Sequence, residues 1–443
     1  MKWLQRIYVN NFTWYVFMGI LVLFVASYIY PPMHRAVWLI FYIYLALVAI
    51  DFLLLFASNQ RFEGVRQVPE KLSNGDENPV TIRLESGYGF PVMAKVIDEL
   101  PYQFQARNFS VDHYVNTGGS VSFEYALRPL ERGEYHFGKL NVYITSPLRL
   151  ACRRFIFGEG HMVPTYPSYI QMRRYDLMAF SNRLFEHGIK KIRRIGHTME
   201  FEQIKEYVSG DDIRTINWKA TAKKNQLMVN QFQDERSQNV YMAIDKGRVM
   251  KMPFNGLSLL DYAINATLVL SNTIIKKNDK AGMFTFSKKV ENRIAADRRS
   301  GQMQKILESL YNVQTNFFES DYGRLYADVK RTITHRSLIL LYTNFETLDG
   351  LKRQLPYLKG IAKSHLLVII FFENTELEEL ILKKAGNVQE IYDQVIAEKF
   401  AFEKRLIVQE LKKYGIHSVL TKPENLTLDS INKYLEIKAR GIL

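Results

Sequence analysis

Two long apolar runs near the amino terminus place the strongest constraint on the fold. Residues 12–30 and residues 37–56 are almost wholly apolar, and the short connection PPMHRA joins them. Each run is roughly 20 residues long, the length that a helix needs to cross the hydrocarbon core of a membrane. Pro31 and Pro32 interrupt the helix between the runs, and the first run is too long for a signal-peptide core. We therefore predict a transmembrane helical hairpin over residues 1–60.

The charges beside the two runs predict the orientation of this hairpin. The connection between the runs carries only Arg35. Cations flank both outer ends of the hairpin: Lys2, Arg6, Arg61 and Arg66. Because cytoplasmic segments are enriched in Lys and Arg, we expect a two-pass protein with both termini and its soluble domains in the cytoplasm.

Asp51 is a carboxylate inside the second apolar run. A carboxylate at membrane depth is by default a candidate functional residue. Its position about one and a half turns from the cytoplasmic end also suits contact with interfacial water and with Arg61. We favour this second interpretation.

The overall composition limits the class of protein and of partner. The chain has 443 residues, enough for two or three domains, and a formal net charge of +14. This basic balance suits an anionic partner, whether lipid headgroups, nucleic acid or an acidic protein face. Cys152 is the only cysteine, so no internal disulfide can form and a reducing compartment is expected. The sequence contains no CxxC, HExxH, P-loop or GxGxxG motif.

From residue 61 to residue 165 the hydrophobic pattern has a period of two. Apolar residues alternate with polar or small neighbours in three runs, which are Val80, Ile82 and Leu84; Val121, Phe123, Tyr125 and Leu127; and Leu140, Val142 and Ile144. Such alternation is typical of half-buried antiparallel strands. We therefore predict an antiparallel, immunoglobulin-like β-sandwich. No catalytic constellation lies in it, so its expected role is spacing or docking.

The next segment, residues 166–238, is interpreted as a linker followed by a central motif. The linker contains a cluster of cations: Lys190, Lys191, Arg193 and Arg194. Such a cluster is usually a solvated face. On the cytoplasmic side of a membrane hairpin it is also well placed to contact anionic lipid. Nucleic acid is not an expected partner, because the chain is tethered to a membrane and shows no recognised nucleic-acid fold.

The central motif lies within residues 206–224, EYVSGDDIRTINWKATAKK. Gly210 suits a turn, and Asp211 or Asp212 suits the cap of a short helix that follows. Such a helix would bury one stripe of residues at helical spacing, formed by Ile213, Ile216 and Ala220. Its solvent side would carry three cations: Arg214, Lys219 and Lys223.

This segment resembles the central motif of the bacterial family named domain of unknown function fifty-eight (DUF58). The matching residues are Glu200, Phe201, Glu206, Tyr207, Gly210, Asp211, Asp212, Arg214, Trp218, Lys219, Leu227, Val229 and Glu235. Upstream, the segment around Ser146 and Pro147 also resembles the family, with Arg149 where glycine is usual. The resemblance implies a protein of the bacterial inner (cell) membrane. It also implies a partner-binding motif made of Glu206, Tyr207, Gly210, Asp211, Asp212, Arg214, Trp218 and Lys219.

Residues 239–443 alternate short apolar runs with helical patterns. Strands are expected at residues 240–245, 283–286, 337–343, 366–372 and 418–420, and helices at residues 257–277, around residues 391–406 and after Thr427. The alternation implies a mostly parallel, doubly wound α/β sheet. A strand that ends in Asp245 and is followed by a loop and a long helix resembles a von Willebrand factor A domain.

The metal site of von Willebrand factor A domains is not matched in this chain. Such domains bind a divalent cation through an Asp-x-Ser-x-Ser loop, helped by a threonine and by an aspartate after a later strand. Here Gly247 and Val249 replace the two serines, and Asn344 stands where the later aspartate would be. Of that set Asp245 remains, so we predict a degenerate site with no metal and no cofactor.

The resemblances imply a function. DUF58 proteins are commonly associated with AAA+ ATPases of the MoxR type, so we expect a non-enzymatic scaffold or adaptor. Its partner surface would combine the Asp211/Asp212/Arg214 turn with the top of the α/β sheet, where open sheets bind ligands. An alternative is a metal-dependent hydrolase that uses four carboxylates, those of Glu200, Glu206, Asp211 and Asp212. A third interpretation is an electrostatic sensor of lipids or glycan precursors.

Overall fold

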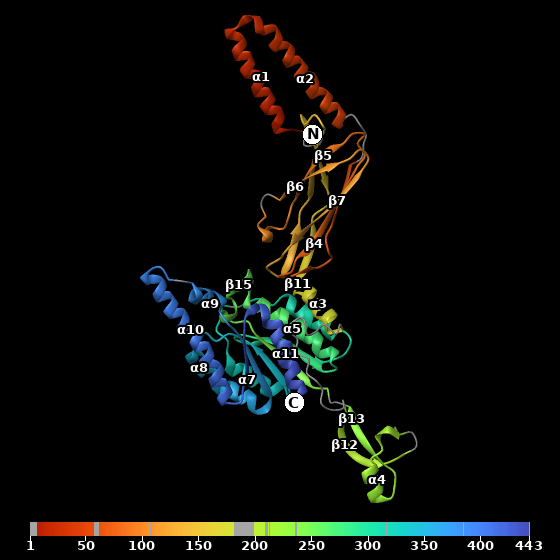
Figure 1. The fold of residues 1–443 in the computed structure, drawn as a ribbon, viewed down its shortest axis with the longest axis vertical. Coiled ribbons are helices and arrows are strands. Elements are labelled where there is room, and N and C mark those ends of the chain that lie inside the picture. The colour runs from red at the N-terminus through yellow and green to blue at the C-terminus, as the bar shows by residue number, and fades with distance from the viewer. Residues whose placement is uncertain are drawn as a thin grey trace. The chain divides into compact units, whose positions relative to one another are not determined.

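The structure, a computed structural model, describes residues 7–56, 62–106, 109–180, 199–208, 211, 213–234, 237–315, 317–383 and 385–442 (Figure 1). The chain divides into two compact units, Met1–Tyr166 and Pro167–Leu443. The first unit contains two apolar helices and a β module, and the second contains the central motif and an α/β domain. Each unit has its own hydrophobic core.

Two apolar helices open the first unit. Helix α1 (Asn11–Ile29) and helix α2 (His34–Phe56) are joined by a single 3-10 turn, η2 (Pro31–Met33). Asn10 caps α1 through its side chain, and the prolines of η2 end the helical run because they lack N–H groups. Most side chains of both helices are apolar and exposed in the chain by itself. Both helices are long and apolar enough to span a membrane.

The β module that follows contains three sheets. A five-stranded sheet has the order β1-β10-β9-β5-β6, and two three-stranded sheets have the orders β2-β4-β7 and β3-β11-β8. The strands are β1 (Ile7–Val9), β2 (Phe62–Gln67), β3 (Leu72–Ser73), β4 (Asn78–Ser86), β5 (Val92–Asp98), β6 (Ser110–Val115), β7 (Ser120–Leu127), β8 (Gly133–Phe137), β9 (Leu140–Thr145), β10 (Ala151–Phe157) and β11 (His161–Tyr166). The period-two runs form β4, β7 and β9, as predicted. Ile82 and Leu84 share a core with Val142 and Ile144 of the five-stranded sheet.

Asp51 of α2 joins the helical hairpin to the five-stranded sheet. Its carboxylate is fully buried and accepts hydrogen bonds from the N–H groups of Leu150 (2.9 Å) and Ala151 (2.6 Å) and from the Ser146 hydroxyl. A buried carboxylate is costly unless it is hydrogen-bonded, so these donors explain why α2 tolerates it. The interpretation that Asp51 faces interfacial water is therefore wrong. Arg61, its other expected contact, lies outside the described residues.

The turn before β10, whose groups donate to Asp51, also contacts the start of α1. The Leu150 carbonyl accepts hydrogen bonds from the backbone N–H of Asn10 (3.2 Å) and from the Thr13 hydroxyl (2.5 Å). Just before α1, strand β1 pairs with β10. Arg149 lies in this turn with φ of 57°, in the left-handed region that favours glycine. This conformation gives a physical reason why glycine is usual at that position.

The α/β domain is built on a six-stranded sheet with the order β18-β17-β14-β19-β20-β21. Neighbouring strands are parallel except that β18 runs antiparallel to β17. The strands are β14 (Asn239–Asp245), β17 (Lys280–Phe286), β18 (Val290–Asp297), β19 (Leu338–Tyr342), β20 (Leu366–Phe372) and β21 (His417–Thr421). The predicted strands are confirmed within two or three residues at each end. β20 coincides with the continuous apolar run, and every one of its residues is buried.

Helices cover both faces of this sheet (Figure 1). They are α3 (Tyr169–Phe180), α5 (Leu259–Lys276), α6 (Gln302–Tyr311), α7 (Tyr322–Thr332), α8 (Leu348–Ser364), α10 (Val388–Lys413) and α11 (Leu426–Ala439). A further helix, α9 (Thr375–Leu382), packs against α10. Val240, Met242 and Ile244 of β14 pack with residues of α5, α6 and α11. Ala243 points the other way and packs with residues of α7, α8 and α10, because successive side chains of a strand alternate. The strand order reverses between β14 and β19. Because these two strands are parallel neighbours, their carboxyl ends lie side by side at this point.

The central motif forms a β-hairpin with a helical insertion. Strands β12 (Met199–Glu206) and β13 (Met228–Asp234) pair antiparallel. Between them lie a 3-10 turn, η5 (Ile213–Thr215), and a seven-residue helix, α4 (Trp218–Lys224). The prediction of a helix with Ile213, Ile216 and Ala220 on one buried stripe is wrong. The helix begins only at Trp218, and Ile213 is 68% exposed.

Candidate functional site

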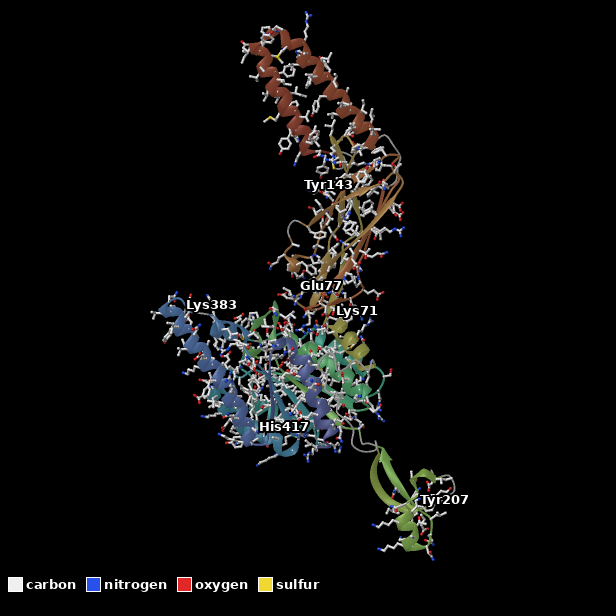
Figure 2. The ribbon with its side chains drawn as sticks, viewed as in Figure 1. Lys71, Glu77, Tyr143, Tyr207, Lys383 and His417 are labelled. Carbon is white, nitrogen blue, oxygen red and sulfur yellow. The ribbon has the colours of Figure 1, made fainter. Side chains whose placement is uncertain are left out.

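The described residues of the central motif lie on the hairpin of β12, η5, α4 and β13. Glu206 ends β12 with an exposed side chain. Tyr207, labelled in Figure 2, follows it and donates its backbone N–H to the Leu227 carbonyl (2.8 Å). Trp218 and Lys219 begin α4, and both are exposed. The predicted site residues that lie outside the described part are Gly210, Asp212, Lys190, Lys191, Arg193, Arg194 and the side chains of Glu200 and Arg214.

Asp211 ties the turn of the motif back to β12. Its Oδ1 accepts from the Lys205 ammonium (2.9 Å), and its Oδ2 accepts from the backbone N–H of Val208 (3.0 Å). The hydrogen bond from Lys205 holds the pKa of the Asp211 carboxyl below its usual value, and the Val208 N–H acts in the same direction. Asn217 caps α4, because its Oδ1 accepts from the Ala220 N–H (3.0 Å). For Asp211 the predicted capping role is therefore wrong.

The hairpin exposes several apolar side chains. Trp218 is 70% exposed, and Ile213 and Val208 are exposed as well. The last turn of the same short helix carries Lys223 and Lys224, which are also exposed. An uncovered tryptophan near cations is the kind of surface that protein interfaces use.

A second group of polar side chains lies at the carboxyl ends of β14 and β19. The Asp245 carboxylate, at the end of β14, is fully buried. Its Oδ1 accepts from the Gly247 N–H (2.8 Å) and from the Ser320 hydroxyl. Its Oδ2 accepts from the hydroxyls of Thr343 (2.7 Å) and Tyr322 (3.3 Å). Burial raises the pKa of the Asp245 carboxyl, while these hydrogen bonds oppose the rise. Both carboxylate oxygens are thus engaged by donors from the chain.

Gly247 allows a second loop to close over Asp245. A Cβ atom at Gly247 would overlap the Ser320 hydroxyl and lie 3.1 Å from the Phe318 carbonyl oxygen. That carbonyl accepts a hydrogen bond from the Arg248 N–H (3.0 Å). The loop that carries Ser320 therefore fills the space that a side chain at Gly247 would need.

Asn344 lies just beyond the end of β19, near this group. Its side chain is buried, and its Oδ1 accepts from the Lys404 ammonium of α10 (2.5 Å). Burial lowers the pKa of Lys404 to about 8, although Glu346 and Glu373 oppose this change. Where the resemblance expects a carboxylate next to a divalent cation, this chain has an amide bonded to an ammonium. An ammonium at that point opposes a second cation.

A cavity of about 440 Å³ opens beside Asn344 and Lys404. Its lining comes from the connection after β14, from the carboxyl ends of β19, β20 and β21, and from α9 and α10. Most of the lining is apolar and includes Phe254, Phe372, Ile381, Leu382, Phe400 and Leu420. The cavity lies at the end of the sheet where ligands bind in open α/β folds.

A family model described as "Protein of unknown function DUF58" matches residues 203–404. Residues 203–404 of this chain are therefore similar to the DUF58 family. A relative from Bacillus subtilis (strain 168), "Uncharacterized protein YeaD", is 26% identical over 262 residues. That alignment covers 57% of this chain and 62% of the relative, so the chain spans less than two thirds of the relative's length.

Solved structures are similar to parts of the chain. The conserved hypothetical protein BatB from Bacteroides thetaiotaomicron has a TM-score of 0.30 at 13% identity, over 46% of this chain and 100% of that one. The SpRpn10 VWA domain has a TM-score of 0.29 at 13% identity, over 44% of this chain and 93% of that one. The PapD-like domain 7 of human CEP192 has a TM-score of 0.19 at 12% identity, over 24% and 86%. No activity follows from likenesses at these scores.

The DUF58 region contains both groups of candidate residues. It begins within β12 and ends at Lys404 of α10, so most of the motif hairpin, Asp245 and Asn344 fall inside it. Four of its residues were missed by the sequence analysis, and these are Ser320, Tyr322, Thr343 and Lys404. Thr343 could have been found, since it directly precedes Asn344 at the end of a strand. Ser320, Tyr322 and Lys404 lie on elements that are distant in the sequence, so no pattern of neighbouring residues points to them.

Proposed function

We propose that this DUF58 protein is a membrane-anchored adaptor that binds a protein partner through the hairpin of β12, α4 and β13. The observation that carries the proposal is Trp218, which is 70% exposed on the first turn of α4. Tryptophan buries a large apolar surface and is enriched at the centre of protein interfaces. An adaptor needs such a surface outside its own core.

The surroundings of Trp218 indicate what the partner offers. Ile213 and Val208 are exposed on the same hairpin, so the partner would cover a patch of apolar surface. Helix α4 has the sequence WKATAKK, with three cations and no acid. A partner with an apolar centre and an acidic rim would complement it. We assign this role to a MoxR-type AAA+ ATPase, as the family resemblance implies.

Membrane anchoring rests on the two apolar helices α1 and α2. The charge pattern supports a bacterial inner-membrane protein with both termini and its soluble domains in the cytoplasm. The β module, proposed to be an immunoglobulin-like sandwich, would then be a rigid spacer, because Asp51 and β1 hold it to the helix ends. A reporter fused after Leu443 should behave as cytoplasmic, and cleavage of that terminus by protease from outside would contradict the orientation.

The parallel strands with helices on both faces support a doubly wound, von Willebrand A-like domain. We propose that its metal site is degenerate. Both carboxylate oxygens of Asp245 accept hydrogen bonds from groups of the chain, and the amide oxygen of Asn344 accepts one from the Lys404 ammonium. This domain would then contribute binding surface and no metal chemistry.

The alternative, a metal-dependent hydrolase, gains no support from the motif. It needs four carboxylates free to hold a cation: Glu200, Glu206, Asp211 and Asp212. Both oxygens of Asp211 are already engaged, one by Lys205 and one by the Val208 N–H. We therefore propose that the protein is not an enzyme.

The test uses the full-length protein in lipid nanodiscs and the purified MoxR-type ATPase from the same organism. Trp218→Ala should weaken binding at least about tenfold, or about 1.4 kcal/mol. The double variant Lys219→Glu/Lys223→Glu should slow association, because it inverts the charge that steers the encounter. Tyr102→Ala is the matched control, since Tyr102 is also an exposed aromatic residue but lies in the β module. Unchanged binding by folded Trp218→Ala would contradict the proposed surface, and absence of binding by the wild type would contradict the proposed partner.

A further inference from the structure

The cavity beside Asn344 has the size and form of a binding pocket. Its volume of about 440 Å³ lies in the range of pockets that hold a side chain or small ligand. Phe372 and Leu420 lie at the ends of β20 and β21 and contribute apolar lining there, while α9 and α10 supply the rest of the apolar wall. Leu382, the last residue of α9, lines the cavity yet is 79% exposed. Lys383, labelled in Figure 2, directly follows it. The pocket therefore has an apolar edge that water covers in the chain by itself.

The polar lining of this pocket is acidic. Its carboxylates are Glu346, Glu373, Glu376 and Glu378, and its cations are Lys404 and Arg405. Four carboxylates against two cations give the lining a formal charge of −2. The whole chain, by contrast, has a net charge of +14. The lining of the pocket is thus negatively charged in a protein whose net charge is positive.

Part of this negative charge is left uncompensated. Glu378 pairs with Lys422 (2.6 Å), and the Lys404 ammonium donates to Asn344. Glu376 is exposed in the first turn of α9, and it forms no ion pair within the described part of the chain. A ligand that brings positive charge to the rim would therefore gain an electrostatic contact without breaking one.

We propose that the pocket docks a basic peptide segment of a protein partner. An apolar side chain of the segment would enter between Phe400, Leu382 and Phe372, and neighbouring Lys or Arg side chains would reach Glu373 and Glu376. The aliphatic stems of Lys and Arg pack on apolar walls while their heads meet carboxylates, so one residue type satisfies both parts of the lining. This inference goes beyond the proposed function, since neither Trp218 nor its hairpin takes part.

The experiment selects peptides from a displayed random library on the full-length protein in nanodiscs. Each round is counter-selected on Leu382→Asp, which places a charge on the apolar rim. Synthetic peptides from the enriched pool are then titrated by fluorescence polarisation at two salt concentrations. The expected consensus is one large apolar residue within a few positions of at least two Lys or Arg residues. Binding should weaken as salt rises.

Two pairs of variants make the result specific. Leu382→Asp should weaken binding at least tenfold, whereas Val388→Asp should not, although Val388 is equally exposed at the start of α10 outside the lining. Glu373→Gln/Glu376→Gln should weaken binding about fivefold and reduce its salt dependence, whereas Glu398→Gln on the exposed part of α10 should change neither. Because the substituted rim residues Leu382 and Glu376 are exposed, these variants are expected to fold.

Several outcomes overturn the proposal. These are an acidic consensus, no enrichment over the counter-selected variant, or equal losses in Leu382→Asp and Val388→Asp. Concentration-dependent dimerisation that Leu382→Asp abolishes would instead assign the pocket to a second copy of the chain. The proposal for the hairpin and the proposal for the pocket can be contradicted independently of each other. Trp218→Ala should leave peptide binding intact, and Leu382→Asp tests the pocket whether or not the ATPase binds.

Discussion

Replacing Asp245 by Ala and, in a second variant, by Asn separates two explanations for a buried carboxylate at the end of β14. If Asp245 organises the loops around it, the property that matters is its ability to accept hydrogen bonds. If Asp245 binds a cation, the property that matters is its negative charge. Ala removes both properties, whereas Asn removes the charge and keeps the size and one acceptor oxygen.

The magnitude for Asp245→Ala follows from the donors that lose their acceptor. The buried N–H of Gly247 would be left unsatisfied, at a cost of about 1–3 kcal/mol. The hydroxyls of Ser320 and Thr343 would each lose a hydrogen bond of about 1 kcal/mol, although the Thr343 hydroxyl lies 2.7 Å from that of Tyr322 and can donate there instead. Removal of a desolvated charge offsets part of this loss. We expect a net loss of about 2–4 kcal/mol in the free energy of unfolding.

Asp245→Asn should cost less than about 1 kcal/mol at neutral pH. Its amide oxygen can accept from Gly247 and Ser320, and its NH₂ group can donate to the hydroxyl oxygens of Thr343 and Tyr322, which rotate to accept. Burial raises the pKa of Asp245 in the folded protein. A raised folded pKa contributes stability that is present below the unfolded value, about 3.9, and is lost as pH rises through the folded pKa. The advantage of Asp over Asn should therefore shrink as pH rises from about 4.

Hydrogen–deuterium exchange of the β14 and β19 amides measures this difference in the full-length protein. A local reporter is needed because a chain of two compact units does not meet the two-state condition for a single unfolding curve. Exchange at increasing urea concentrations, between pH 4 and pH 8, gives the free energy of opening for each variant. The reasoning is refuted if Asn costs as much as Ala, or if the advantage of Asp grows as pH rises.

Other substitutions test the remaining contacts. Gly247→Ala should destabilise the α/β domain by about 1–3 kcal/mol, and Ser320→Ala should relieve part of that loss in a double-mutant cycle. Asp51→Ala should lower the stability of the junction with the β module by about 2–4 kcal/mol, because two buried N–H groups lose their acceptor. Hydrogen–deuterium exchange of the β10 amides measures this loss, and unchanged exchange would show that the carboxylate is not needed. Arg149→Gly should stabilise that turn by about 0.5–1 kcal/mol, because it removes a left-handed conformation from a non-glycine residue, and a lower melting temperature would contradict this. Calorimetric titration with Mg²⁺ and Mn²⁺ should show no binding tighter than about 1 mM; tighter binding that disappears in Asp245→Ala would contradict the degenerate site.

The error in the central motif shows where a periodic pattern misleads. Ile213, Ile216 and Ala220 have helical spacing, and a stripe of that kind usually faces a core. In the structure they belong to an insertion between β12 and β13, where α4 has only seven residues and Asn217 sets its start. Periodicity reports that a segment could present an apolar face. It does not report whether another element lies against that face.

The sequence by itself determined the elements whose signal is local and continuous. The two apolar runs form α1 and α2, and the uninterrupted run LLVIIFF forms β20, because a strand covered on both faces has no position where a polar side chain is favoured. The motif residues between Glu206 and Lys219 likewise predicted the resemblance to DUF58 without knowledge of the fold, and the DUF58 model matches residues 203–404. In each case the residues that carry the information are neighbours in the chain.

Only the tertiary structure decided which groups meet at the two buried carboxylates and at the pocket. The Thr343 hydroxyl that bonds Asp245 is 98 residues away along the chain, and Ala151 is 100 residues from Asp51. Lys404 reaches Asn344 across 60 residues, from helix α10, which packs against one face of the sheet. Such pairs are fixed by strand order and by helix packing on the sheet faces. A hydrogen bond between distant residues imposes no spacing on the sequence around either partner, so the sequence alone leaves it undetermined.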